Sequence, residues 1–182
     1  MLKEAAATVG AAQIQNRGTL GGNIANSSPA GDSLPVWLAL DARFELSSVR
    51  GVREVPAAEF WHDYKRTALA QDELITAVLV PPVQGRTFFR KVGTRMAQSI
   101  SKVVFCGRYG DEARVAFGAV APVPLRLHAV EEALIARGPV AEVAELAAAH
   151  IHPIDDVRST AEYRRRVAVN VLRGWLDVLR AG

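Results

Sequence analysis

The separation of strand-like from helical patterns along the chain is the feature that most constrains its fold. Residues 42–49 alternate between apolar and polar side chains, and residues 74–80 form a short apolar run that Pro81 ends, which is typical of a buried strand. From about residue 127 the chain is instead alanine-rich and helical, with a break at Gly138-Pro139. Strands followed by helices, rather than strands that alternate with helices, indicate an α+β fold.

The second half of the sequence contains its own set of strands and a long terminal helix. Thr87–Val92 is predicted to be a strand, and Ser101–Arg108 and Ala113–Val120 are predicted to form a hairpin across Gly110-Asp111. Ser159 to Glu162 has the pattern of a capping box that opens a helix through about Leu179. We therefore place a boundary near residues 81–86 and divide the chain into domains 1–82 and 83–182.

Composition excludes several classes of protein. The 182 residues include no apolar run of the ~20 residues that a membrane-spanning helix needs, and the N-terminus is too weakly apolar for a signal peptide, so we expect a cytoplasmic protein. A single cysteine, Cys106, excludes an intrachain disulfide and a cysteine-ligated cluster built by this chain alone, and its apolar neighbours predict a buried thiol. The formal net charge is +3, and the arginines after residue 157 lack the interleaved aromatic residues of a nucleic-acid-binding surface.

The glycine-rich segment Asn16–Asn23 is the most unusual stretch of the chain. It follows a predicted short helix at residues 3–15 and precedes another at Ser33–Leu40. Adjacent Gly21 and Gly22 allow the backbone to approach a ligand closely and permit positive φ, and successive N–H groups in such a turn bind anions. The segment has neither the Lys-Ser/Thr pair of a P-loop nor the preceding strand of a dinucleotide-binding motif. Taken alone, it favours a phosphate-binding turn and a tight structural turn about equally.

A longer stretch around these glycines carries a specific resemblance. Gln13–Asp32 closely resembles the FAD-contacting segment of the flavoprotein subunits of carbon monoxide dehydrogenase, xanthine dehydrogenase and related molybdenum hydroxylases. The resemblance continues in the same order along the chain, through residues 38–42, 51–53, 72–75, Lys91 with Arg95, 117–124 and 155–164. It implies the second half of an FAD-binding domain of the PCMH type, followed by a small α+β C-terminal domain of antiparallel strands and helices.

The resemblance also implies a role for individual residues, and all of these roles concern the cofactor rather than catalysis. The turn that cradles the FAD diphosphate corresponds to Thr19, Gly21, Gly22 and Asn23, with Asn26 nearby. Asp32 corresponds to a ligand of the sugar-like portion, Ile75 to a backbone and apolar contact, and Lys91 to a lysine near the flavin ring. A cation beside the ring would stabilise the anionic reduced flavin. Judged without the family, Lys91 would be interpreted as a solvated lysine at a strand end.

Two departures from the family pattern affect what we expect of the isolated chain. Val9 stands where some relatives place an aromatic residue against the cofactor. Such subunits also begin with a subdomain that supplies a second glycine-rich loop, and we find no counterpart to it here. We therefore expect the purified chain to hold little FAD, and to expose apolar surface near its N-terminal helix that favours self-association or a partner chain.

By resemblance, the complete system oxidises a small substrate at a molybdenum cofactor and passes electrons through iron–sulfur clusters to FAD, which then reduces an acceptor. This chain would be the FAD-binding electron-transfer subunit, with the molybdenum-cofactor subunit and the iron–sulfur subunit as partners. It would contribute no metal ligand, since His150 and His152 are predicted to lie in a loop at a helix end. One alternative is a non-catalytic remnant or assembly module that binds no flavin, and another is a phosphate-ligand site without flavin chemistry.

Overall fold

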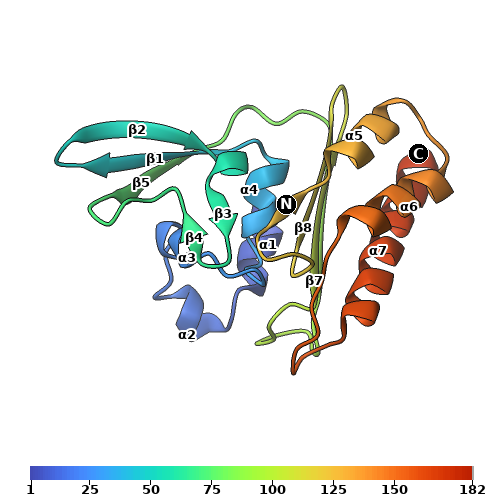
Figure 1. The fold of residues 1–182 in the computed structure, drawn as a ribbon, viewed down its shortest axis with the longest axis horizontal. Helices are drawn as coiled ribbons and strands as arrows, with labels where there is room; N and C mark the ends of the chain where they lie inside the picture. The colour runs from blue at the N-terminus through green and yellow to red at the C-terminus, as the bar shows by residue number, and fades with distance from the viewer. Residues whose placement is uncertain (182) are drawn as a thin grey trace.

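The computed structural model describes residues 1–181, and its elements form two antiparallel sheets with helices between and beside them (Figure 1). The sheet of the N-terminal region lies on the left in Figure 1, the second sheet stands edge-on in the centre, and the C-terminal helices cover its right-hand face. The structure thus confirms the α+β fold predicted from the sequence.

The N-terminal region begins with four short helices and continues with five strands. The helices are α1 (Leu2–Thr8), α2 (Ala12–Gln15), α3 (Leu20–Asn26) and α4 (Leu34–Ala39). The strands are β1 (Arg43–Ser48), β2 (Gly51–Pro56), β3 (Trp61–Asp63), β4 (Arg66–Thr67) and β5 (Leu74–Leu79), with the 3₁₀ turn η1 (Ala57–Glu59) before β3. Strands β2, β1 and β5 form one antiparallel sheet in that order, and β3 pairs with β4.

The C-terminal region consists of a four-stranded antiparallel sheet followed by three helices. The sheet has the order β6 (Arg86–Val92), β7 (Val103–Tyr109), β8 (Ala113–Gly118) and β9 (Leu125–Arg126). The helices are α5 (His128–Ile135), α6 (Val140–His150) and α7 (Ala161–Ala181). The predicted hairpin of β7 and β8 and the predicted terminal helix are confirmed.

Strand β7 explains how the two regions are joined, because both of its faces are buried. Side chains alternate between the two faces of a strand. Val104 and Cys106 therefore pack in one core with α4 and the N-terminal sheet, and Val103 and Phe105 pack in the other core with α5, α6 and α7. The first core crosses the predicted boundary at residue 82, and the division into domains 1–82 and 83–182 stays a prediction.

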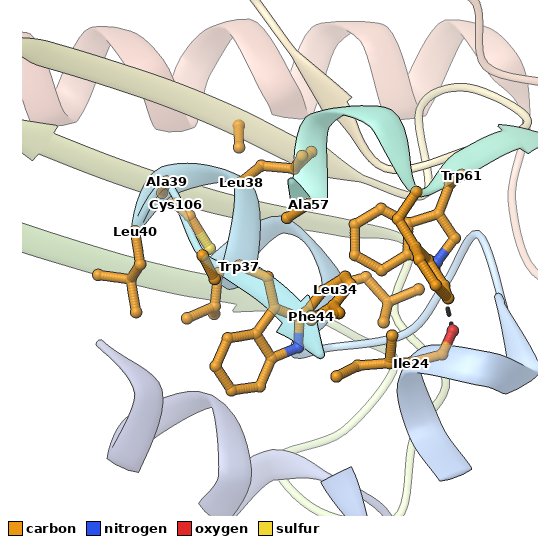
Figure 2. Close-up of a cluster of buried hydrophobic side chains, with 14 of the residues drawn as sticks. Ile24, Leu34, Trp37, Leu38, Ala39, Leu40, Phe44, Ala57, Trp61 and Cys106 are labelled. Atoms are coloured by element: carbon orange, nitrogen blue, oxygen red, sulfur yellow. Dashed lines mark hydrogen bonds between the residues drawn. The ribbon is translucent and has the colours of Figure 1, made fainter. Parts of the chain in front are cut away.

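Helix α4 fills the space between the two sheets, and every one of its residues is buried. Figure 2 shows the cluster that forms around it. Phe44 on β1 meets Phe60 and Trp61 edge to face, with ring centroids 4.9 and 5.5 Å away. The indole N–H of Trp61 donates to the backbone carbonyl of Ile24 at 3.3 Å, and this bond ties α3 to the core.

Several sequence predictions need correction. The helix predicted over residues 3–15 is two helices, because Gly10 adopts a left-handed φ of +55° between them. The run at 74–80 is not a buried strand, since β5 lies at a sheet edge and alternates between exposed and half-buried side chains. Helix α7 is capped by Thr160 rather than Ser159, through a bond from the N–H of Tyr163 to Thr160 Oγ1 at 3.2 Å. Strand β2, which lacks a clean alternation, was not predicted.

Within residues 1–181, none of the helices combines the length and the apolar character that crossing a lipid bilayer requires.

Candidate functional site

A cavity of about 890 Å³ opens where the N-terminal helices meet the loops of the C-terminal region. Its N-terminal wall includes the segment from Val9 to Ile14 and the segment from Ser28 to Asp32. Its C-terminal wall includes the loop between β6 and β7, the loop after β8 and the segment before α7. The apolar part of its lining includes Ile14, Ile100, Pro122 and Ile154. The cavity therefore depends on both regions of the chain.

The glycine-rich segment forms the first turn of helix α3 and is not a tight turn. Thr19 is the N-cap residue, and its Oγ1 accepts the N–H of Gly22 at 2.9 Å while its carbonyl accepts the N–H of Asn23 at 3.0 Å. Neither Gly21 nor Gly22 has a positive φ, so the conformational reason that the sequence suggested for the glycines is wrong. The N–H groups of Gly22 and Asn23 are thus already bonded within the helix and are not available to an anion. The N–H groups of Leu20 and Gly21 lie in the first turn of α3, where no earlier turn of the helix supplies a carbonyl to accept them.

Both glycines lie in close packing. A Cβ on Gly21 would lie 3.4 Å from the carbonyl oxygen of Ile75, an ordinary contact distance, so α3 packs directly against strand β5 at this position. A Cβ on Gly22 would lie 2.9 Å from Thr19 Oγ1 and would displace the cap. The structure therefore brings Gly21 and Ile75 together, and their contact with a cofactor stays a prediction.

The two asparagines of α3 are held in different ways. Asn23 lines the cavity, and its Oδ1 accepts a hydrogen bond of 2.5 Å from Ser33 Oγ. Asn26 lies one turn further along the helix, where its carbonyl and its Oδ1 accept hydrogen bonds from Lys65 Nζ at 2.8 and 3.0 Å. Lys65 also lines the cavity, so Asn26 positions a cation at the cavity wall.

Asp32 and Lys91 form a nearly buried ion pair beside the cavity. The distance from Lys91 Nζ to Asp32 Oδ2 is 2.6 Å, and the two side chains are 9% and 7% exposed. Lys91 Nζ also donates to the carbonyl of Thr8 at 2.8 Å, and Ser101 Oγ donates to Asp32 Oδ1. The interpretation of Lys91 as a solvated strand-end lysine is therefore wrong: the pair joins the N-terminal helices to β6 and to the loop before β7.

A second charged cluster, Asp156 with Arg158 and Arg164, lines the cavity on its C-terminal side. Asp156 Oδ1 accepts Arg164 Nη2 at 2.8 Å, and Asp156 Oδ2 accepts Arg158 Nη1 at 3.1 Å. Desolvation raises the pKa of Asp156, but the backbone N–H of Arg158 and the guanidinium of Arg164 outweigh it and lower the pKa to about 2. The carboxylate is therefore ionised at neutral pH.

Sequence reasoning did not identify this second cluster. The stretch 155–164 is one of the segments that carry the family resemblance, and the sequence pattern of its arginines excludes only a nucleic-acid-binding surface. Arg164 is 4% exposed and bonds to the carbonyls of Lys102 and Ala119 at 2.9 and 3.2 Å. The available signal was the short Asp-Asp-x-Arg spacing just before a helix cap, which fixes a turn.

Of the predicted cofactor residues, Asn23 and Asp32 line the cavity directly. Lys91 lies behind Asp32, and Thr19, Gly21, Gly22, Asn26 and Ile75 lie on or against α3. Val9, the position of a predicted departure from the family, is also part of the lining.

Comparisons with known proteins assign a family model to each of the two regions of the chain. Residues 1–83 match the family described as FAD binding domain in molybdopterin dehydrogenase, and residues 94–178 match the CO dehydrogenase flavoprotein C-terminal domain. The glyceraldehyde dehydrogenase medium chain of Sulfolobus acidocaldarius is 32% identical over 92% of this chain and 63% of its own length. The carbon monoxide dehydrogenase medium chain of Hydrogenophaga pseudoflava is 29% identical over 97% of this chain and 66% of its own length.

Solved structures give the same result. Carbon monoxide dehydrogenase from Hydrogenophaga pseudoflava superimposes with a TM-score of 0.86 and 29% identity, over 93% of this chain and 63% of that one. Quinoline 2-oxidoreductase from Pseudomonas putida superimposes with a TM-score of 0.84 and 25% identity. The chain spans about two thirds of the length of these relatives.

Fold and matched domains together define a flavoprotein of the molybdopterin dehydrogenase class. The chain belongs to the family of FAD-binding subunits of molybdenum-hydroxylase-type dehydrogenases, whose members include the carbon monoxide and xanthine dehydrogenase subunits.

Proposed function

We propose that this chain binds FAD at the cavity between its two regions and acts as an electron-transfer subunit. In this proposal an iron–sulfur subunit supplies the electrons, and a molybdenum-cofactor subunit oxidises the substrate. The observation that carries the proposal is the position of the cavity, because Asn23 and Asp32 line it together with residues of the C-terminal region. Both are residues for which the sequence predicts contact with the cofactor.

The cavity fits a flavin in size and in chemistry. Its volume of about 890 Å³ lies within the roughly 300–1,000 Å³ of pockets that bury cofactors and other small ligands. Ile14, Ile100 and Ile154 provide apolar surface suited to the face of an aromatic ring, and Asn23 and Lys65 provide polar groups suited to its edges and chain. When bound, FAD would supply the redox chemistry that protein side chains lack.

The predicted residues on and against α3 are assigned the roles that the family pattern implies. Thr19 holds the first turn of α3, and we assign that turn, with Gly21, Gly22 and Asn23, to the diphosphate of FAD. Asn26 fixes Lys65 at the wall. These roles, like the contact proposed for Ile75, rest on the family pattern together with the place of α3 beside the cavity.

Asp32 and Lys91 are proposed to act as a unit. Lys91 holds the Asp32 carboxylate at the cavity wall, where it can accept hydrogen bonds from sugar-like hydroxyl groups. The proposed position of Lys91 near the flavin ring is retained, with Asp32 as its immediate partner.

Filling the cavity tests where FAD binds. Ala121→Trp adds bulk inside the cavity, whereas Ala149→Trp adds the same bulk at an exposed position on α6. Titration with FAD should show binding to the parent and to Ala149→Trp, and binding at least tenfold weaker to Ala121→Trp, which corresponds to ~1.4 kcal/mol or more. Equal affinity for FAD in both variants would place the cofactor elsewhere. Equal thermal stabilisation by ADP and FAD would favour a phosphate-ligand site instead.

Assembly tests the electron-transfer role. Co-expression with iron–sulfur and molybdenum-cofactor subunits from the same source should give a complex whose flavin absorbance bleaches when substrate is added. A complex that assembles without flavin, and whose substrate oxidation does not change when the chain is left out, would support the assembly module.

A further inference from the structure

The charges that line the cavity do not cancel. Lys65, Arg158 and Arg164 are cationic, and Asp32 and Asp156 are the carboxylates among the lining residues. Lys91 lies behind Asp32 at 2.6 Å and neutralises it. The Asp156 cluster, in contrast, has one carboxylate for two arginines and leaves a net positive charge at the C-terminal wall.

The turn that carries Arg158 is rigid. Asp156 Oδ1 accepts the backbone N–H groups of Arg158 and Ser159 at 2.8 and 3.0 Å, and the backbones of Asp156 and Ser159 bond to each other in both directions. Arg164 anchors the same carboxylate from α7. The positive charge is therefore held in place before any ligand arrives, which lowers the cost of binding.

The two arginines have different functions in this cluster. Arg164 is 4% exposed, and its Nη atoms bond to Asp156 and to two backbone carbonyls. Its Nε is buried and lacks a hydrogen-bond partner within residues 1–181. Arg158 is 42% exposed, and its guanidinium makes one bond to residues 1–181, from Nη1 to Asp156. Arg158 thus has N–H donors available to a ligand, whereas Arg164 fixes the position of Asp156 in the cavity wall.

We propose that Arg158 increases the preference of this cavity for the more negatively charged, reduced form of the cofactor. The inference rests on the proposed function, because it takes FAD as the ligand. Reduced flavin carries a negative charge on its pyrimidine ring above neutral pH, so a cation that remains unbalanced at the wall stabilises it more than the neutral oxidised ring. Lys91 contributes less to this preference, since Asp32 already cancels its charge.

The test compares the dissociation constants of the full chain for oxidised FAD and for FAD reduced anaerobically, at pH 8. We expect the parent to bind reduced FAD about tenfold more tightly, as one charge-assisted hydrogen bond would give. Arg158→Gln should reduce the ratio of the two constants to roughly one to three. The same tenfold ratio would appear as a midpoint potential about 30 mV higher for the bound flavin.

Two further variants sharpen the result. Arg173→Gln removes the same charge from an exposed position on α7 and should leave the ratio unchanged. Asp156→Asn keeps an acceptor for the turn but removes the negative charge, so the ratio should rise above that of the parent. Melting temperatures of all variants show whether the turn is intact.

The outcomes separate the two proposals. A parent chain that binds neither form of FAD, either alone or in complex with its iron–sulfur and molybdenum-cofactor subunits, overturns the proposed function and this inference with it. A parent that binds FAD, with equal ratios for Arg158→Gln and Arg173→Gln, overturns the inference alone and leaves the cofactor site in place.

Discussion

Two charged clusters of this protein differ in how their charges are matched, and the first of them joins the N-terminal and C-terminal regions. In the first, here named the Asp41 cluster, Asp41 at the end of α4 accepts Arg108, Arg114 and Arg126 at 2.6 to 2.8 Å. Glu112 and Glu131 pair with the same arginines, so three carboxylates face three guanidinium groups. In the Asp156 cluster, one carboxylate faces two.

The surroundings of the two clusters match this difference. The Asp41 cluster lies where α4 meets β7, β8 and β9, away from the large cavity, and its arginines are 7 to 17% exposed. The Asp156 cluster lines that cavity, and its outer arginine is 42% exposed. A buried cluster with equal numbers of positive and negative groups holds regions together. A cluster with excess positive charge beside a cavity can interact with a ligand of negative charge.

The largest effect is expected from Asp41→Asn. The change leaves three nearly buried arginines facing two carboxylates, and it should lower the free energy of unfolding by about 3 kcal/mol. Asn tolerates the left-handed φ of +50° at this position, so the loss would come from the charge rather than from backbone strain. Urea denaturation measures it. A loss below about 1 kcal/mol would show that the cluster does not join the regions.

The next largest effect is expected at low pH, where the Asp156 cluster should lose its contribution to stability. The pKa of Asp156 lies at about 2 in the folded protein and near 3.8 in the unfolded chain. Because the folded pKa is the lower one, ionised Asp156 stabilises the fold above about pH 4, and that contribution disappears as the pH falls toward 2. After allowance for solvent screening it amounts to roughly 1 kcal/mol. Unfolding curves of the parent and Asp156→Asn should therefore converge as the pH falls through this window, and curves that stay parallel would contradict the assignment.

A smaller effect is expected from salt, which should weaken the interactions of the Asp156 cluster more than those of the Asp41 cluster. The Debye length shortens from about 10 Å at 0.1 M to about 3 Å at 1 M salt, and exposed charges are screened more than buried ones. The effect of Arg158→Gln on the preference for reduced FAD should therefore weaken about two- to threefold over that range. The stability loss in Asp41→Asn should change little. If both effects fall together, burial is not what distinguishes the clusters.

The smallest effect is expected at the surface pair of Arg43 and Glu54, which joins β1 to β2 and is 49% and 44% exposed. Glu54→Gln should change the free energy of unfolding by less than about 0.5 kcal/mol. This variant controls for Asp41→Asn, since both replace a paired carboxylate with an amide. A loss as large as that at Asp41 would remove burial as the explanation.

The elements that the sequence predicted well are those with a strong local pattern. The hairpin of β7 and β8, helix α4 and the long helix α7 follow from apolar runs, a turn dipeptide and helical spacing. Strand β5 was assigned to the interior because its run is apolar, but position in a sheet depends on pairing partners that are distant in sequence. The same limit applies to Gly21, whose contact with Ile75 on β5 joins segments that are distant in sequence.

The sequence by itself determined the α+β class and the family, because these depend on composition, periodicity and a specific twenty-residue segment, and it predicted the side chains of a cofactor site. It could not determine how those side chains pair. The bond between Asp32 and Lys91 spans 59 residues, and the contact of Asp156 with the cavity wall depends on α7 packing against the second sheet. Whether a charged side chain is neutralised by a partner depends on groups that are distant in sequence, and only the tertiary structure decides which of these groups come into contact.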